Sequence, residues 1–68
     1  MERMNEKQMK ELVGKKFFVK CSDGAKFNNL ILKEIGNQNA EVQFLYFENQ
    51  QSKLNIIPIE KIERMEEI

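Results

Sequence analysis

The chain lacks the residue types on which most catalytic and metal sites depend. Its 68 residues contain no histidine and no tryptophan, with one cysteine, one proline and three glycines. Histidine is the most frequent general acid–base group at neutral pH and a common zinc ligand, so we expect no enzymatic activity, no metal and no cofactor. Cys21 has no second cysteine to pair with, which excludes an intramolecular disulfide.

Long apolar runs are also missing, and the charges balance. No stretch approaches the roughly 18 apolar residues that a membrane span needs, and no signal-peptide-like run opens the chain. A lone thiol suits a reducing compartment, so we expect a cytoplasmic protein without a membrane partner. The 11 basic and 11 acidic groups give a net charge of zero. A chain this short forms one domain, residues 1–68, and self-association is a natural further source of its stability.

From residue 15 onward, strand-like segments alternate with polar turns. The four predicted strands are Lys15–Cys21, Lys26–Ile35, Glu41–Glu48 and Lys53–Ile57. Pro58 ends the fourth strand, residues 59–62 predict one helical turn, and residues 63–68 predict either a last edge strand or a continued helix. Short strands at regular spacing predict a mostly β (α+β) fold, in which residues 15–68 form a four- to five-stranded antiparallel small barrel.

Residues 1–13 predict a short helical leader. They are rich in good helix formers, and Asn5 is placed to cap the helix while Met4 staples its entry. Three apolar residues spaced three and four apart share one face, and a glycine then ends the helix. These residues are Met9, Leu12, Val13 and Gly14. A helix of about two turns is unstable alone, so we expect it to lie across an open end of the barrel.

The alternation of apolar residues predicts which side chains of the first two strands face the core. The turn after the first strand is predicted at Ser22–Gly24, and Asn28–Asn29 interrupts the second strand and predicts a bulge or a strong bend. The side chains expected to face inward are Phe17, Val19, Cys21, Leu30 and Leu32.

The third strand alternates so that two apolar sets point in opposite directions. Val42, Phe44 and Tyr46 share one face. Leu45 and Phe47 share the other, which begins with polar residues. Leu45 and Phe47 must therefore meet the leader helix, meet another subunit, or stand exposed.

The order of these segments resembles the small-barrel superfold of Sm-like and Src-homology-3-like domains. The resemblance rests on the helix followed by Gly14–Lys20, the turn at Asp23–Gly24, and the segment Leu54–Ile62. In that superfold five bent strands close into a barrel, and one helical turn separates the fourth strand from the fifth. Pro58–Ile62 occupies the place of that turn. The resemblance implies this architecture for most of the chain.

The functional motifs of those families are not carried over. Asn39 lies where the Sm-like RNA-binding loop has an asparagine, but Ile35 and Gly36 stand where its aspartate is expected. Asn55–Pro58 replaces the family's second basic, glycine-containing element. Without tryptophan, the chain also lacks the aromatic cluster with which Src-homology-3 domains bind proline-rich peptides. The resemblance therefore assigns no binding residue.

A non-enzymatic protein-interaction module is the favoured function, because small barrels mostly bind other molecules. Phe18, Leu45 and Phe47 are the candidate contacts, as an exposed apolar patch, unless the leader helix covers them. Edge strands of such a barrel can pair with a protein partner or with a second copy. The Asn-, Ile- and Lys-rich composition suggests an AT-rich genome, and hence a bacterial or phage accessory protein.

Nucleic-acid binding is the alternative. Lys16, Phe18, Lys20 and Lys26 together make a small basic and aromatic face for base stacking and phosphate contact. Residues 1–26 carry seven basic and four acidic groups, whereas residues 27–68 carry four and seven. The plain alternative is that Phe18 packs beneath the leader and the lysines only keep the protein soluble. The zero net charge favours that plain reading.

Overall fold

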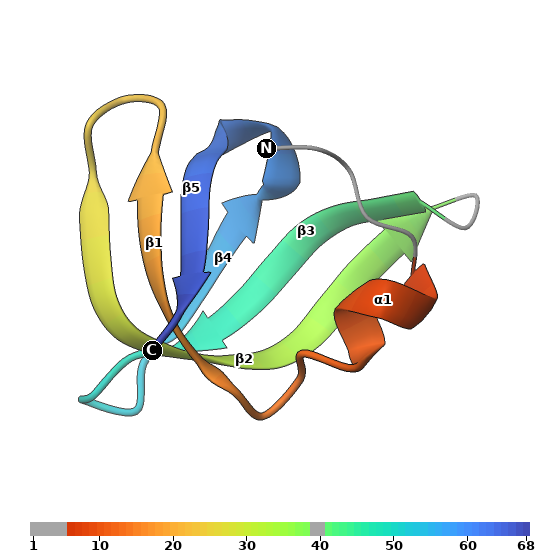
Figure 1. Ribbon diagram of the computed structural model, residues 1–68, viewed down its shortest axis with the longest axis horizontal. Helices are drawn as coiled ribbons and strands as arrows, with labels where there is room; N and C mark the ends of the chain where they lie inside the picture. Colours follow the sequence, from red (N-terminus) through yellow and green to blue (C-terminus); the bar gives the residue numbers. More distant parts are fainter. Residues whose placement is uncertain (1–5, 39–40) are drawn as a thin grey trace.

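Five antiparallel strands form one sheet, with a short helix beside it (Figure 1). The computed structural model describes residues 6–38 and 41–68. The order along the sheet is β4-β3-β2-β1-β5, and every neighbouring pair is antiparallel. The elements are α1 (Glu6–Lys10), β1 (Lys16–Cys21), β2 (Lys26–Gln38), β3 (Glu41–Glu48), β4 (Leu54–Pro58), the 3-10 turn η1 (Ile59–Lys61) and β5 (Ile62–Glu67). The predicted mostly β fold class is confirmed.

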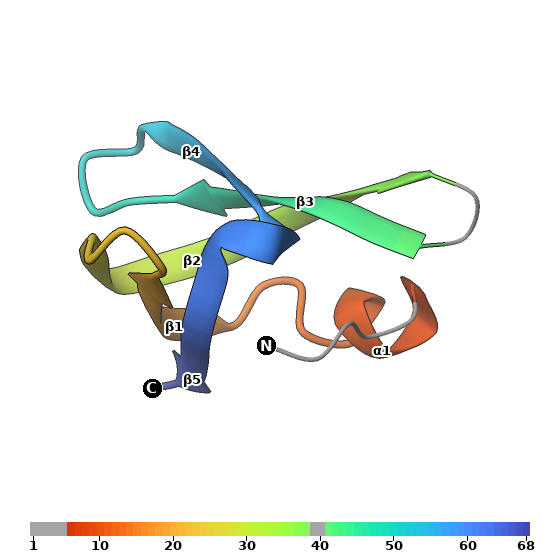
Figure 2. The ribbon, with the colours of Figure 1, turned by 90° about the horizontal axis from the view of Figure 1, so that it is seen from above.

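The sheet curls, but it does not close. β2 is long and curved, and it pairs with β1 along one part and with β3 along the other (Figure 1). Seen from above, β5 crosses in front of the β2–β3 layer (Figure 2). β4 and β5 remain the two edges, with no ladder between them in residues 6–38 and 41–68. The arrangement is compatible with a small barrel-like fold, without the hydrogen-bonded closure of a complete barrel.

Most predicted strand ends lie within one residue of the observed ends, but the predicted helix is too long: α1 ends at Lys10, and Val13 of its predicted apolar face is 40% exposed. The last residues form strand β5, one of the two predicted alternatives, and the single turn before it is η1. β2 continues to Gln38, beyond the predicted end at Ile35. The predicted cap Asn5, the staple Met4 and the loop residue Asn39 lie outside the described residues.

A bulge at the predicted position bends β2. The β1–β2 register shifts between Phe17 and Val19, so that Asn28 and Asn29 together face Phe18. Asn29 has a positive φ of 57°, a conformation that asparagine tolerates better than most residues. The extra residue increases the local bend, which lets one strand serve two neighbours that run in different directions.

A second bulge, on β3, was not predicted, and it corrects the facing of that strand. Gly36 pairs with Phe44, but Asn37 pairs with Val42, so Gln43 is an extra residue. Val42 and Leu45 are therefore both buried, although they are three residues apart, while Phe44 is 44% exposed. The prediction that Val42 and Phe44 share a face is wrong, because one inserted residue reverses the alternation beyond it.

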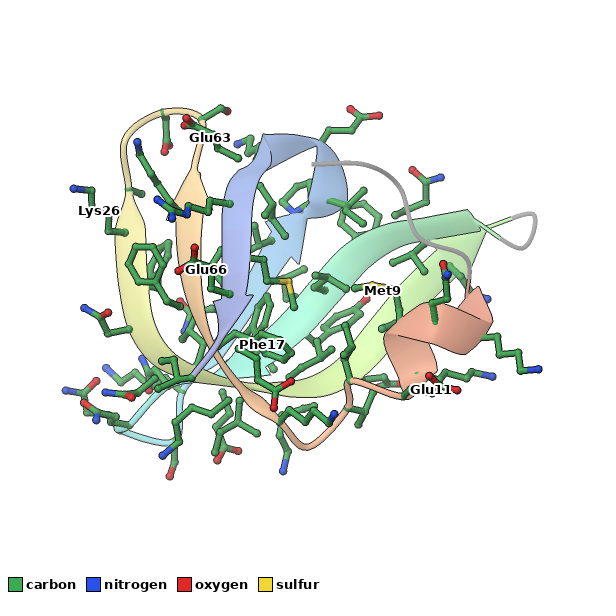
Figure 3. All side chains as sticks on the ribbon, in the orientation of Figure 1. Met9, Glu11, Phe17, Lys26, Glu63 and Glu66 are labelled. Atoms are coloured by element: carbon green, nitrogen blue, oxygen red, sulfur yellow. The ribbon has the colours of Figure 1, made fainter. Side chains whose placement is uncertain are left out.

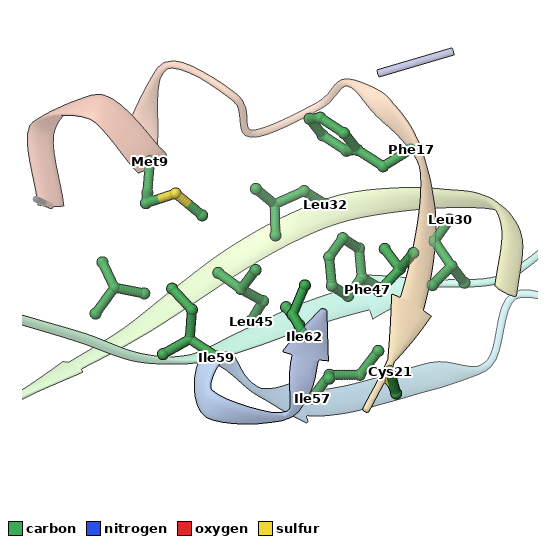
Figure 4. Close-up of a cluster of buried hydrophobic side chains, with 12 residues drawn as sticks. Met9, Phe17, Cys21, Leu30, Leu32, Leu45, Phe47, Ile57, Ile59 and Ile62 are labelled. Atoms are coloured by element: carbon green, nitrogen blue, oxygen red, sulfur yellow. The ribbon is translucent and has the colours of Figure 1, made fainter. Parts of the chain in front are cut away.

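The core lies between the curled sheet, η1 and α1 (Figure 4). All five side chains predicted to face inward from β1 and β2 are buried. Met9 of α1 is fully buried in the core cluster, and α1 contacts β2 and β3, so the described part of the leader lies over the core. The backbone N–H of Gly14 donates to the carbonyl oxygen of Leu32 at 2.7 Å, which ties the end of the leader to β2. Among the residues whose burial the structure describes, the buried ones are Met9, Phe17, Val19, Cys21, Leu30, Leu32, Val42, Leu45, Phe47, Ile57, Ile59 and Ile62.

Candidate interaction surface

The outer side of β3 and β4 carries exposed apolar side chains. Residues directly opposite each other on paired strands share a face, and here Tyr46 lies opposite Ile56 and Phe44 opposite Pro58. Leu54 is 59% exposed, Ile56 54% and Phe44 44%. We call this surface the β3–β4 apolar face; it consists of Phe44, Tyr46, Leu54, Ile56 and Pro58.

Gly36 on β2 extends this face by making room for an aromatic ring. A Cβ at Gly36 would lie 3.0 Å from Cε2 and 3.2 Å from the hydroxyl oxygen of Tyr46. The ring of Tyr46 therefore lies against the bare backbone of β2. Because Phe44 is directly opposite Gly36, the two aromatic residues stand together at this end of the sheet.

The backbone of β4 presents free hydrogen-bonding groups to solvent at alternate residues. The N–H of Asn49 donates to the carbonyl oxygen of Lys53 at 2.9 Å, which fixes the start of the β3–β4 ladder. In an antiparallel ladder, bonded and non-bonded pairs alternate, so Asn55 and Ile57 bond to β3 while Leu54 and Ile56 point away from it. Pro58 falls in the outward set, where the N–H that it lacks is not needed.

The loop before β4 holds that register in place. The side-chain Oδ1 of Asn49 accepts hydrogen bonds from the backbone N–H groups of Gln51 and Lys53, each at 2.9 Å. The N–H of Ser52, which has a positive φ of 62°, donates to the carbonyl oxygen of Asn49 at 3.0 Å. A turn therefore fills the interval between the third and fourth predicted strands, and its bonds fix which backbone groups of β4 face outward.

The opposite edge of the sheet is charged, whereas β4 carries no charge at all. Lys20 Nζ lies 3.7 Å from Oε1 of Glu63, and Arg64 Nη2 lies 2.6 Å from Oε1 of Glu66. Charged side chains on an edge strand oppose pairing with another chain, because pairing would bring them together or desolvate them. β5 is protected in this way and β4 is not. The exposed charged residues of β5 are Glu63, Arg64, Glu66 and Glu67.

The structure places two of the three predicted protein-contact residues in the core. Leu45 and Phe47 are each 0% exposed and lie in the same buried cluster as Met9 of α1, so the exposed-patch alternative is wrong and the alternative of coverage holds. The bulge at Gln43 is the reason, because it turns them inward and their neighbours outward. Phe18 is half-buried on the outer side of β1, on a different part of the sheet from the β3–β4 apolar face. In the sequence, the exposed β3–β4 apolar face is marked only by the uncharged segment Leu54–Pro58.

The four residues of the predicted basic face do lie on one side of the sheet. Lys16, Phe18 and Lys20 alternate along the outer side of β1. Lys26 is directly opposite Lys20 on β2, and Arg64, which the sequence did not suggest, is directly opposite Lys20 on β5. Three cations therefore form a row across three strands, an arrangement of like charges that is unfavourable without nearby anions.

Acidic side chains of β5 partly neutralise this row. Glu63 lies near Lys20, Glu66 is bonded to Arg64, and Glu66 is also directly opposite Phe18. Figure 3 shows Lys26, Glu63 and Glu66 on the half of the molecule away from α1. The face is therefore a mixture of cations and anions around one half-buried aromatic ring.

The single thiol is part of the core and not of either surface. Cys21 is buried, and burial raises the pKa of its thiol, with the charge of Asp23 raising it further and that of Lys61 opposing the change. The thiol is therefore protonated at neutral pH, which makes it a poor nucleophile.

Comparison with known proteins gave no match among protein families, curated proteins or solved structures. Within residues 6–38 and 41–68, no helix has the length and apolar character needed to cross a membrane.

Proposed function

We propose that this protein is a non-enzymatic protein-interaction module that binds an extended segment of a partner along β4. In strand addition, main-chain hydrogen bonds supply affinity and alternate side chains supply specificity. Leu54 and Ile56 provide both kinds of contact, because their backbone groups point away from β3 and their side chains are exposed. The partner segment that suits them is extended, uncharged and apolar at alternate positions.

The contrast between the two edges of the sheet is the observation that carries this proposal. Both edges have unpaired backbone groups, but only β5 has the charged side chains that normally prevent pairing. An exposed edge that keeps Leu54 and Ile56 instead of a lysine or glutamate is poorly protected against other chains. Such an edge suits a binding site.

We also propose that the fold is a member of the Sm-like and Src-homology-3-like small-barrel superfold. The strand order β4-β3-β2-β1-β5, the bent β2 and the 3-10 turn η1 between β4 and β5 support this. The superfold hosts many unrelated binding functions, so it adds no partner by itself. A cytoplasmic accessory role in a bacterium or phage remains the proposed setting, on the composition of the chain.

Two variants with the same chemical change test the binding site. Ile56→Lys adds a charge to the middle of β4, and Ile68→Lys adds one to an equally exposed isoleucine after β5; the wild-type side chains are 54% and 64% exposed. Each protein is immobilised, and a lysate is passed over it after nuclease treatment. We expect stoichiometric partners to be lost from Ile56→Lys and retained by Ile68→Lys. Retention of the same partners by both variants would contradict binding at β4.

Nucleic-acid binding is a second candidate, favoured by the row of three cations. Lys20 stands between Lys26 and Arg64, beside Phe18, and directly opposed cations are relieved by an anionic ligand. The test is fluorescence anisotropy with a labelled single-stranded oligonucleotide at several salt concentrations. Binding through this face must weaken steeply with salt and be reduced by Lys20→Ala, while Lys53→Ala, on the other edge, leaves it unchanged. Absence of binding at low salt would eliminate this candidate.

A further inference from the structure

We propose that the segment that pairs with β4 is β4 of a second copy of the same chain. The two strands run antiparallel, and the two-fold axis passes through Ile56, so that the two five-stranded sheets continue into one another. This inference rests on the proposed function, because it takes β4 as the interaction edge. It adds the partner and the register.

The outward backbone groups of β4 match their own copies in this register. Ile56 of each copy can donate its N–H to, and accept from, Ile56 of the other, as in any hydrogen-bonded antiparallel pair. Leu54 can donate its N–H to the carbonyl oxygen of Pro58 in the second copy. The reciprocal bond from Pro58 to Leu54 cannot form, because proline has no N–H. The side chains of paired residues meet on the same outer face of the sheet.

The lengths of the strands select this register. Centring the axis on Ile56 overlaps all of Leu54–Pro58 in both copies. Moving the axis toward the start of β4 would require Ser52 to pair with the second copy. Ser52 has a positive φ, and its N–H is already bonded within the loop, so it is unsuited to a strand ladder. Moving it toward the end brings the 3-10 turn η1 into the ladder.

The charges around β4 are compatible with a second copy. The strand has no charged residue, so like charges do not meet at the centre of the interface. Lys53 precedes β4 and Glu60 follows it in η1. Because the strands are antiparallel, the Lys53 end of each copy lies beside the Glu60 end of the other. A two-fold contact repeats this favourable juxtaposition, as an isologous interface requires.

The size of the contact indicates a weak dimer. A standard interface covers about 800 Å² on each partner, which is roughly a sixth of the 4680 Å² surface of this chain. One five-residue strand and its apolar neighbours cover less than that. We therefore expect dissociation constants on the order of micromolar or weaker, so that dimers form as concentration rises.

Cysteine cross-linking tests the register directly. In the proposed pair the two Cα atoms of residue 56 are about 5.5 Å apart, which is within the range that a disulfide bridges. The two copies of residue 54 are separated by four residues along the strand, or about 13 Å. Under mild oxidation, Ile56→Cys should give covalent dimers, while Leu54→Cys, at an equally exposed position, should give few. Equal cross-linking at both positions, or none at residue 56, would overturn the proposed register.

Opposite charges at one position test whether the contact is between like strands. By sedimentation, the wild type should dimerise with increasing concentration, while Ile56→Lys and Ile56→Glu should each stay monomeric. Their equimolar mixture should form heterodimers. Circular dichroism melts that match the wild type establish that both variants fold. Dimerisation of either variant alone, as strong as that of the wild type, would overturn the proposal.

These outcomes separate this inference from the proposed function. If the wild type stays monomeric while Ile56→Lys still loses a captured partner, β4 binds another protein and only the present inference fails. If Ile56→Lys retains both self-association and the captured partner, both proposals fail.

Discussion

Replacing Leu45 with alanine tests the reversed facing of β3, and Leu54→Ala is the matched control. The same side chain is shortened in both variants, but Leu45 is 0% exposed and Leu54 is 59% exposed. Shortening a buried leucine costs about 2–5 kcal/mol, because lost burial and the remaining cavity both contribute. Substitutions at exposed positions usually stay within ~0.5 kcal/mol.

This difference is large compared with the stability of the whole domain. At roughly 0.05–0.15 kcal/mol per residue, a chain of 68 residues has a free energy of unfolding of about 3–10 kcal/mol. With a urea m-value of about 1 kcal/mol/M, Leu45→Ala lowers the unfolding midpoint by about 2 M or more, and Leu54→Ala by less than ~0.5 M. Urea titrations followed by circular dichroism measure both. Equal midpoints for the two variants would refute the assignment of Leu45 to the core.

Three further predictions concern the core thiol, the β3–β4 loop and the close approach at Gly36. The pKa of Cys21 is raised in the folded protein, so the thiol of the unfolded chain loses its proton first, and the free energy of unfolding should fall as the pH rises above about 8.5. Between pH 7 and 9.5, the urea midpoint should therefore fall less in Cys21→Ala than in the wild type. An equal fall in both proteins would contradict Cys21 as the cause of the pH dependence. Asn49→Ala removes two hydrogen bonds to the loop backbone and should cost about 1 kcal/mol in urea unfolding, whereas no loss would show that the loop does not depend on them. Gly36→Ala should lower the free energy of unfolding less when it is combined with Tyr46→Ala, because the added Cβ meets the Tyr46 ring. If the two losses of stability simply add in a double-mutant cycle, the contact is contradicted.

Local sequence pattern predicted the parts of this fold in which alternation runs without interruption. Along β1, every second residue faces the core as predicted, and the Asn28–Asn29 pair correctly marked the bulge in β2. Gln43 gave no such signal, since a polar residue on a strand normally points outward without shifting the register. That single insertion moved Leu45 and Phe47 from the predicted surface into the core.

The candidate surfaces depend on pairings that no local pattern contains. Arg64 comes to lie opposite Lys20 only because β5 pairs with β1, which joins the two ends of the chain. The backbone N–H and C=O of Ile56 point away from the sheet because β4 is an edge strand, and the neighbours of Ile56 in sequence do not reveal this. The composition does distinguish the two edge strands, because Leu54–Pro58 is uncharged whereas β5 is rich in charged residues.

Residue-resolved hydrogen exchange of the β4 amides tests the central claim most directly. In dilute protein, the amides of Asn55 and Ile57 should be protected by β3, while those of Leu54 and Ile56 should exchange quickly. Raising the concentration should slow exchange at Leu54 and Ile56 and leave the exposed charged edge of β5 unchanged. Amides of Leu54 and Ile56 that are protected even at high dilution, or that never respond to concentration, would contradict the account of β4 as a self-pairing edge.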